Sequence, residues 1–202
     1  MWEELFARHN VRLWGIASLE TAINGAEGYK CIAFGLPYDR AAVAALPDDR
    51  LIDYSRRELS RRSKAIYTAI RKEHPEFRFE FYDDVDRIYG LREKGVSQKV
   101  LGHLAGLGWI GKSSLLVSPQ FGPRIRLGTI FTKNPLKVTG APFQGDCGDC
   151  MMCAEICPSH AIDEAGYNVA KCRQVVTDDN GKYKTFCGLC MKVCPQGDSI
   201  NA

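Results

Sequence analysis

The first two thirds of the chain carry apolar and polar patterns that predict both strands and helices. Apolar and charged residues alternate over Phe77–Phe81, which predicts a strand with one buried face. Cys31–Phe34 is wholly apolar, as in a strand that is buried on both faces. The runs Val11–Ile16 and Ile125–Thr132 are two further strand candidates.

Two helices are predicted between these strands. Over residues 49–73, Leu59, Ile66 and Ile70 recur near one face while Arg and Lys fill much of the rest, as in a helix that lies on a core. A second helix is predicted over residues 97–104. Because strands and helices alternate, we expect an α/β domain over residues 1–133.

The chain changes character after residue 133. Residues 134–146 hold two Pro and two Gly, a composition that predicts a linker. Residues 147–202 then follow as a separate small module. We therefore expect one α/β domain, a linker and a compact C-terminal domain.

Composition narrows the class of protein. The chain has 202 residues, of which 45% are hydrophobic, and a net charge of +3, so a globular protein is expected and wholesale disorder is not. No apolar run approaches the ~18 residues of a membrane span. The first residues lack the basic and apolar regions of a secretory signal. We expect a cytoplasmic protein that binds neither membrane nor DNA.

The cysteines are concentrated at one end of the chain. Eight of the nine lie in the last 56 residues. A small secreted scaffold would spread its cysteines along its length, whereas a local cluster in a cytosolic protein indicates metal binding. The order is Cys147-x2-Cys150-x2-Cys153-x3-Cys157-Pro, then Cys172 alone, then Cys187-x2-Cys190-x3-Cys194-Pro.

This spacing predicts two [4Fe–4S] clusters. Three cysteines at two-residue gaps wrap one cluster, and the fourth, beside a Pro, points to a different cluster. Two such runs exchange their fourth ligands. Predicted cluster one takes Cys147, Cys150, Cys153 and Cys194, and predicted cluster two takes Cys157, Cys172, Cys187 and Cys190.

Zinc and disulfides are the alternatives. Two four-cysteine zinc sites would also use eight cysteines, usually as paired C-x2-C knuckles. The dense first run and the two Cys-Pro ends favour iron–sulfur. The module is too small to bury much apolar surface, so without clusters residues 147–202 should be largely unfolded.

A glycine loop precedes the cysteines. Gly106–Ser113 satisfies the phosphate-loop pattern G-x4-G-K-S, but a helix rather than a strand is predicted before it, and Trp109 and Ile110 are bulky. Nucleotide hydrolysis is therefore not favoured. We expect His103 to be a structural or surface residue and Cys31 to be part of the core.

At these residues the sequence resembles a known family. Leu104–Lys112, Phe121-Gly122, Leu127–Thr132 and the eight-cysteine module are similar to epoxyqueuosine reductases. The resemblance implies an α+β sandwich of the nitroreductase or corrinoid-reductase type, followed by a bacterial-ferredoxin-like domain with two [4Fe–4S] clusters. In that family electrons pass through the clusters to cobalamin, which removes the epoxide oxygen of a modified tRNA base.

The resemblance also implies site residues. The cofactor pocket would be lined by Gly106, Gly108, Trp109, Ile110, Gly111 and Lys112. The proton-donating Asp expected about a dozen residues before the loop has no counterpart, so Glu93, Asp83 and Asp84 are the candidate catalytic residues. The helical-repeat tail with which that family grips tRNA has no counterpart either, which leaves the substrate open.

Two functions follow from these observations. The first is a reductase that passes electrons from a donor such as ferredoxin or flavodoxin, through the clusters, to cobalamin or less plausibly a flavin. Its substrate would be small or nucleotide-like, for instance a modified tRNA nucleoside. The second is an electron-transfer protein whose α/β domain docks a partner and holds no organic cofactor. The glycine loop favours the first, and the missing Asp favours the second.

Overall fold

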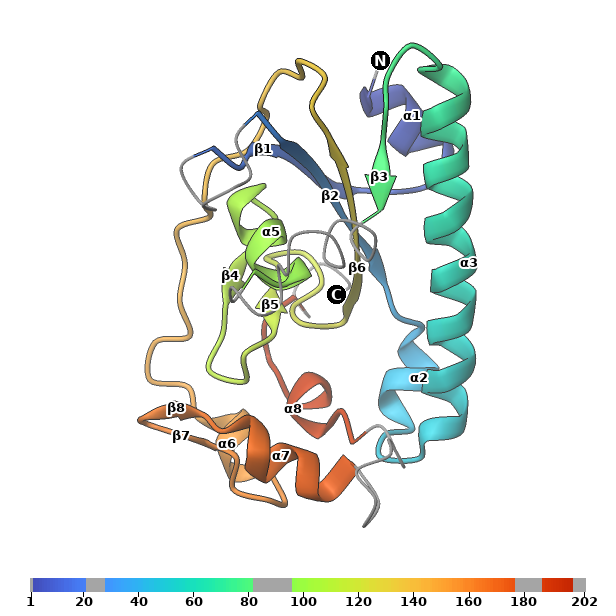
Figure 1. The fold of residues 1–202 in the computed structure, drawn as a ribbon. Helices are drawn as coiled ribbons and strands as arrows, with labels where there is room; N and C mark the ends of the chain where they lie inside the picture. Colours follow the sequence, from blue (N-terminus) through green and yellow to red (C-terminus); the bar gives the residue numbers. More distant parts are fainter. Residues whose placement is uncertain (1, 21–27, 82–95, 177–186, 198–202) are drawn as a thin grey trace. The chain divides into compact units, whose positions relative to one another are not determined.

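The computed structural model describes residues 2–20, 28–81, 96–176 and 187–197 (Figure 1). The chain divides into two compact units, and each contains several separate stretches of sequence. The sheet unit comprises Met1–Leu36, Ser60–Trp109 and Arg126–Gln144. The cysteine unit comprises Pro37–Leu59, Ile110–Ile125 and Gly145–Ala202. The predicted boundaries at residues 133 and 147 stay a prediction.

The sheet unit is built on a four-stranded sheet in the order β1-β2-β6-β3. Its strands are β1 (Leu13–Ser18), β2 (Lys30–Pro37), β3 (Glu80–Phe81) and β6 (Ile125–Thr132). β1 and β2 are antiparallel, with Leu13 opposite Gly35, and β3 is antiparallel to β6. The architecture is mixed α/β, as predicted.

Helices lie on both faces of β1. Trp14 stacks on Phe6 of α1 (Trp2–Arg8), with ring centroids 4.9 Å apart. A Cβ on the next residue, Gly15, would collide with the backbone of Ala105, which caps α5 (Gln98–Leu104). Because successive residues of a strand point to opposite faces, α1 and α5 cover opposite sides of the strand.

The long helix α3 (Asp49–Glu73) has the predicted limits. Leu59, Ile66 and Ile70 are buried, which confirms the predicted apolar face. No helix among the described residues is long and apolar enough to cross a membrane.

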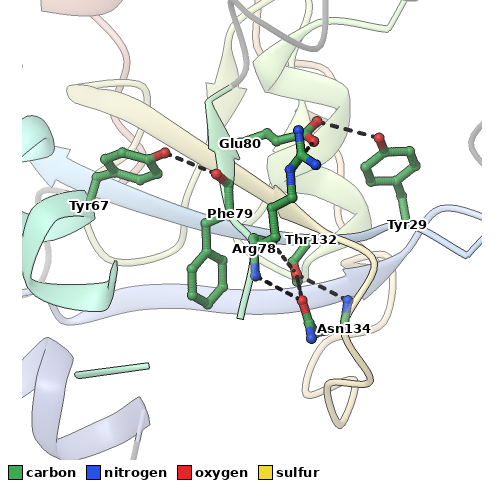
Figure 2. A network of polar contacts seen from close by, with 7 residues as sticks. All are labelled: Tyr29, Tyr67, Arg78, Phe79, Glu80, Thr132 and Asn134. Atoms are coloured by element: carbon green, nitrogen blue, oxygen red, sulfur yellow. Dashed lines mark hydrogen bonds and ion pairs between the residues drawn. The ribbon is translucent and has the colours of Figure 1, made fainter. Parts of the chain in front are cut away.

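One predicted strand is mostly wrong. Of Phe77–Phe81, only the last two residues form β3. Side chains instead hold the backbone of the preceding residues (Figure 2): Thr132 Oγ1 donates to the Arg78 carbonyl at 2.7 Å, and Tyr67 donates to the Phe79 carbonyl at 3.0 Å. The Arg78 N–H donates to Asn134 Oδ1 at 3.1 Å. These bonds satisfy the backbone without a strand ladder.

The cysteine unit consists of short elements (Figure 1). They are α2 (Arg40–Ala44), β5 (Leu116–Val117), α6 (Met152–Glu155), β7 (Ile162–Asp163), β8 (Gly166–Tyr167), α7 (Val169–Val176) and α8 (Leu189–Lys192). The two residues of β4 (Trp109–Ile110) are divided between the units. Its apolar core joins α2 and the start of α3 to α8, through Ala42, Val43, Leu46, Ile52 and Met191. Lys192 Nζ also donates to the Leu46 carbonyl at 2.7 Å.

Candidate metal centre

All nine cysteines lie in the part of the chain that the structure describes, and none of them forms a disulfide. Nor does any group of three or more His, Cys, Asp or Glu side chains among the described residues come close enough to hold a single metal ion. A zinc ion would need its four sulfurs at about 2.3 Å from one point.

Five cysteines line a small cavity of about 20 Å³, which we call cavity A. Four of them are Cys147, Cys150, Cys153 and Cys194, the set predicted for cluster one. The rest of the lining is Gly111, Lys112, Ser113, Val117, Met152, Cys190, Pro195 and Gln196.

Local backbone geometry bends the first cysteine run around cavity A. Gly148 adopts a left-handed φ of 49°, which a glycine tolerates without strain, and its N–H donates to Asp146 Oδ1 at 2.7 Å. The Cys150 N–H donates to the Cys147 carbonyl at 3.1 Å, which closes the turn. The turn therefore brings thiols that are three residues apart to one cavity.

The end of the glycine loop lies against this turn. A Cβ on Gly111 would come within 3.2 Å of Cys147 Sγ and 2.8 Å of the Val117 side chain, so only glycine fits there without a shift. Lys112 Nζ donates to the Gly148 carbonyl at 2.7 Å and to the Cys150 carbonyl at 3.2 Å. The phosphate-loop pattern thus places its lysine on a cysteine turn.

Arg124 holds the distant fourth cysteine of cavity A. Its guanidinium donates to the Cys194 carbonyl at 2.7 Å and also to the Gln196 carbonyl. The sequence predicted no structural role for this residue, because the contact joins positions about 70 residues apart.

A second cavity, cavity B, has a volume of about 310 Å³. Its cysteines are Cys157, Cys172, Cys187 and Cys190, the set predicted for cluster two. Most other lining residues are apolar, including Leu115, Ile125, Ile162, Val176 and Met191, together with Tyr38 and Tyr167. Ser113 and Cys190 line both cavities, so A and B are neighbours.

The isolated Cys172 reaches cavity B because of its helix. It lies in α7, which follows the β7–β8 hairpin, and its N–H donates to the Asn168 carbonyl at 3.2 Å. Burial raises the pKa of Tyr167 well above its usual range, and a hydrogen bond with Cys172 adds to this effect.

Burial governs the protonation of the thiols. Burial and the neighbouring Cys187 raise the pKa of Cys190 to about 12. Burial also raises the pKa of Cys194, although Arg124 opposes that shift. For Cys157, burial is outweighed by hydrogen bonds, among them one from the Ala161 N–H at 3.3 Å, so its pKa is lowered. Deprotonating the thiols whose pKa is raised requires a compensating positive charge.

The first half of the predicted cofactor loop lies in the sheet unit and contacts its own chain. Gly106 has a left-handed φ of 79°, and a Cβ there would be 3.0 Å from the Ala141 carbonyl oxygen. The Trp109 ring stacks on Phe143, with centroids 5.8 Å apart. Thr139 Oγ1 accepts the Ile16 N–H at 2.9 Å, so the segment 139–143 is held over the loop.

Four further residues considered in the sequence, Gly108, His103, Ile110 and Cys31, lie in the described part of the chain. Gly108 has a φ of 159°, and its carbonyl lies 2.9 Å from His103 Nδ1, which gives His103 the expected structural role. Ile110 is 40% exposed. Cys31 is fully buried, and burial raises the pKa of its thiol well above the usual range. The candidate catalytic residues Glu93, Asp83 and Asp84 lie outside the described residues.

Several curated proteins that are similar to the chain in sequence are epoxyqueuosine reductases. No protein-family model matches the chain. Epoxyqueuosine reductase from Synechocystis sp. is 29% identical over 157 residues, which cover 71% of this chain and 51% of that protein. The enzyme from Synechococcus sp. is 34% identical over 105 residues, covering 45% of this chain and 32% of that protein. The chain spans about a third to a half of such relatives.

Solved structures show the same likeness in fold. Epoxyqueuosine reductase from Streptococcus thermophilus has a TM-score of 0.64 at 17% identity, covering 96% of this chain and 65% of that one. A catabolic reductive dehalogenase has a TM-score of 0.70 at 18% identity, covering 96% of this chain and 31% of that one. The chain therefore resembles epoxyqueuosine reductases in both sequence and fold, as its glycine loop and cysteine module predicted.

Proposed function

We propose that the chain is an iron–sulfur oxidoreductase of the epoxyqueuosine reductase type, with two [4Fe–4S] clusters in its cysteine unit. Cluster one would be held in cavity A by Cys147, Cys150, Cys153 and Cys194. Cluster two would be held in cavity B by Cys157, Cys172, Cys187 and Cys190. The observation that carries the proposal is that seven of the eight cysteines line one cavity each as in the crossed pattern, while Cys190 lines both cavities.

The donor set fits iron–sulfur clusters better than zinc. Eight thiols without His or carboxylate partners are typical ligands of such clusters. Cavity B, at about 310 Å³, is far larger than a single ion requires. The thiols of cavity B therefore surround an open volume, as expected for ligands that bind the corners of a cubane.

The shared lining of the cavities supports electron transfer between the clusters. Cys190 would ligate cluster two and also borders cavity A. Each [4Fe–4S] cluster exchanges one electron, and two adjacent clusters form a short relay. The cysteine unit would therefore receive electrons one at a time from a carrier such as ferredoxin or flavodoxin.

The acceptor of these electrons is the less supported part of the proposal. A B12-dependent mechanism has been put forward for a reductive dehalogenase of this fold, and an epoxyqueuosine reductase was solved with a modified tRNA stem-loop. By analogy, a corrinoid would supply the reducing centre, with a modified tRNA nucleoside as candidate substrate. Glu93, Asp83 and Asp84 remain the candidate proton donors.

Two described residues of the predicted cofactor loop, Gly106 and Trp109, pack against the chain itself. Ala141 lies where a side chain of residue 106 would be, and Phe143 covers one face of Trp109. The last two loop residues, Gly111 and Lys112, lie against the cysteine turn. We therefore assign no residue contact to a corrinoid. This packing favours the second candidate function, an electron carrier without an organic cofactor.

Anaerobic purification and titration with cobalamin separate the two candidates. Both predict about eight irons per chain and a broad visible absorbance that bleaches on reduction. The reductase predicts that the chain binds cobalamin and shifts its corrin bands, and the carrier predicts unchanged bands. A chain that binds zinc, or fewer than about four irons after reconstitution, would contradict both.

A further inference from the structure

We propose that Lys112 is a positioning residue for cluster one, which fastens the first cysteine turn and raises the reduction potential of that cluster. This inference rests on the proposed iron–sulfur function. It concerns a residue that the phosphate-loop pattern would assign to a nucleotide, and that the family resemblance would assign to a corrinoid pocket.

The contacts of Lys112 converge on one turn. Its Nζ atom donates to the Gly148 carbonyl at 2.7 Å and to the Cys150 carbonyl at 3.2 Å, and it lies 3.4 Å from Met151 Sδ. All three partners lie between Cys147 and Cys153, the first and last thiols of the turn. One ammonium group therefore joins the glycine loop to the segment that would supply three ligands of cluster one.

These partners leave the positive charge in place. Carbonyl oxygens and a thioether are neutral acceptors, so the contacts orient the ammonium group without neutralising it. Lys112 is half-buried and lines cavity A together with the four thiols. Its charge therefore lies beside the site in which the cluster's own charge changes.

The charge has a defined effect on reduction. Adding an electron makes the cluster more negative, and a nearby cation stabilises that state more than the oxidised one. Net charge near a cluster is one of the main determinants of its potential. No Lys or Arg belongs to the described lining of cavity B. Lys112 is thus expected to raise the potential of cluster one above the value that this cluster would have without that charge.

Three substitutions separate charge from anchoring. Lys112→Gln keeps an N–H donor and removes the charge, Lys112→Met removes both, and Lys112→Arg keeps both. Lys171→Met is the matched control, because Lys171 also donates to a carbonyl, that of His160 at 3.4 Å, but lines neither cavity. Each variant is prepared anaerobically as the full chain, and iron content is measured first.

The decisive readout is the midpoint potential of each cluster, followed by electron paramagnetic resonance during a redox titration. For Lys112→Gln we expect the equilibrium constant for reducing cluster one to fall about tenfold, which corresponds to about 59 mV for a one-electron step. Lys112→Arg and Lys171→Met should leave it near the wild-type value. Lys112→Met should also release iron from cluster one several-fold faster to a chelator.

Two results would overturn the inference. A Lys112→Gln protein with full iron content and unchanged potentials would remove the charge effect. A Lys112→Met protein that releases iron at the wild-type rate would remove the anchoring role. If Lys112→Met binds no iron, Lys112→Gln and Lys112→Arg still test the charge. A wild-type chain without iron would instead contradict the proposed function, before any variant is compared.

Discussion

Cavities A and B are both lined by cysteines and share Cys190, but they are built in different ways. Three thiols of cavity A come from one seven-residue turn, and two cations, Lys112 and Arg124, hold the carbonyls of its ligand segments. Cavity B takes its thiols from several separate segments and is lined mainly by apolar side chains. Site A, the cluster site in cavity A, is thus formed by a local turn whose backbone is held by hydrogen bonds. Site B, the cluster site in cavity B, is formed by the apolar core that surrounds it.

Of the changes considered for sites A and B, removing iron should have the largest effect on the folded structure. Because few described residues of the segment 147–197 are buried hydrophobics, anaerobic chelation should unfold much of this segment and leave the sheet unit folded. Hydrogen exchange followed by mass spectrometry should show lost protection in α7 and α8 and retained protection in β1 and β2. Unchanged protection in α7 after complete iron removal would contradict the expected dependence on metal.

Replacing Cys172 should break site B alone. In Cys172→Ser, cluster two loses one ligand, so the spectrum of the reduced protein should change from two interacting [4Fe–4S] signals to one. Cys31→Ala is the matched control, because that cysteine is buried in β2 of the sheet unit. Two unaltered cluster signals in Cys172→Ser would show that Cys172 is not a ligand.

Truncating Met191 should weaken the core on which site B depends. The side chain is 3% exposed, packs in the core of the cysteine unit and lines cavity B. Met191→Ala should cost about 2–5 kcal/mol of unfolding free energy, measured by anaerobic denaturant titration. Val169→Ala, at a 51% exposed position that lines neither cavity, is the control and should cost much less. Equal losses would argue against a core-dependent site B.

Adding a methyl group at Gly111 should destabilise site A, and the loss of stability should be smaller than that of Met191→Ala. Its backbone conformation accepts other residues, so the expected effect of Gly111→Ala comes from crowding Cys147 and Val117. Such overpacking costs about 1–3 kcal/mol. Chelators should remove cluster one faster, while cluster two serves as the internal reference. Faster loss of cluster two instead would contradict the placement of Gly111 at cavity A.

Local patterns accounted for much of the fold. The helical spacing of the apolar residues Ile66 and Ile70 predicted α3, and the strand-like run Ile125–Thr132 predicted β6. The strand predicted over residues 77–79 failed because partners more than 50 positions away, such as Asn134, satisfy that backbone. The seven-residue α1 and five-residue α2 are too short for a clear helical period.

In the candidate site, too, the sequence indicated local features but not the contacts between distant segments. Cysteine spacing, a local property, predicted two groups of thiols; seven of the eight line one cavity each in that grouping, Cys190 lines both, and the ligand sets stay a prediction. The contributions of Tyr38 and Arg124 arise only when distant segments meet, so no pattern announced them. Lys112 belongs to a phosphate-loop pattern that is recognisable in the sequence. The cysteine turn to which it donates is evident only in the three-dimensional structure.

The central claim is that the eight C-terminal cysteines bind two iron–sulfur clusters in crossed fashion. Anomalous diffraction at the iron absorption edge, from crystals grown without oxygen, tests it most directly. The claim predicts two four-iron peaks, one among Cys147, Cys150, Cys153 and Cys194 and one among Cys157, Cys172, Cys187 and Cys190. Peaks only at the zinc edge, sulfur–sulfur bridges, or Cys157 bound to the same cluster as Cys147 would contradict it.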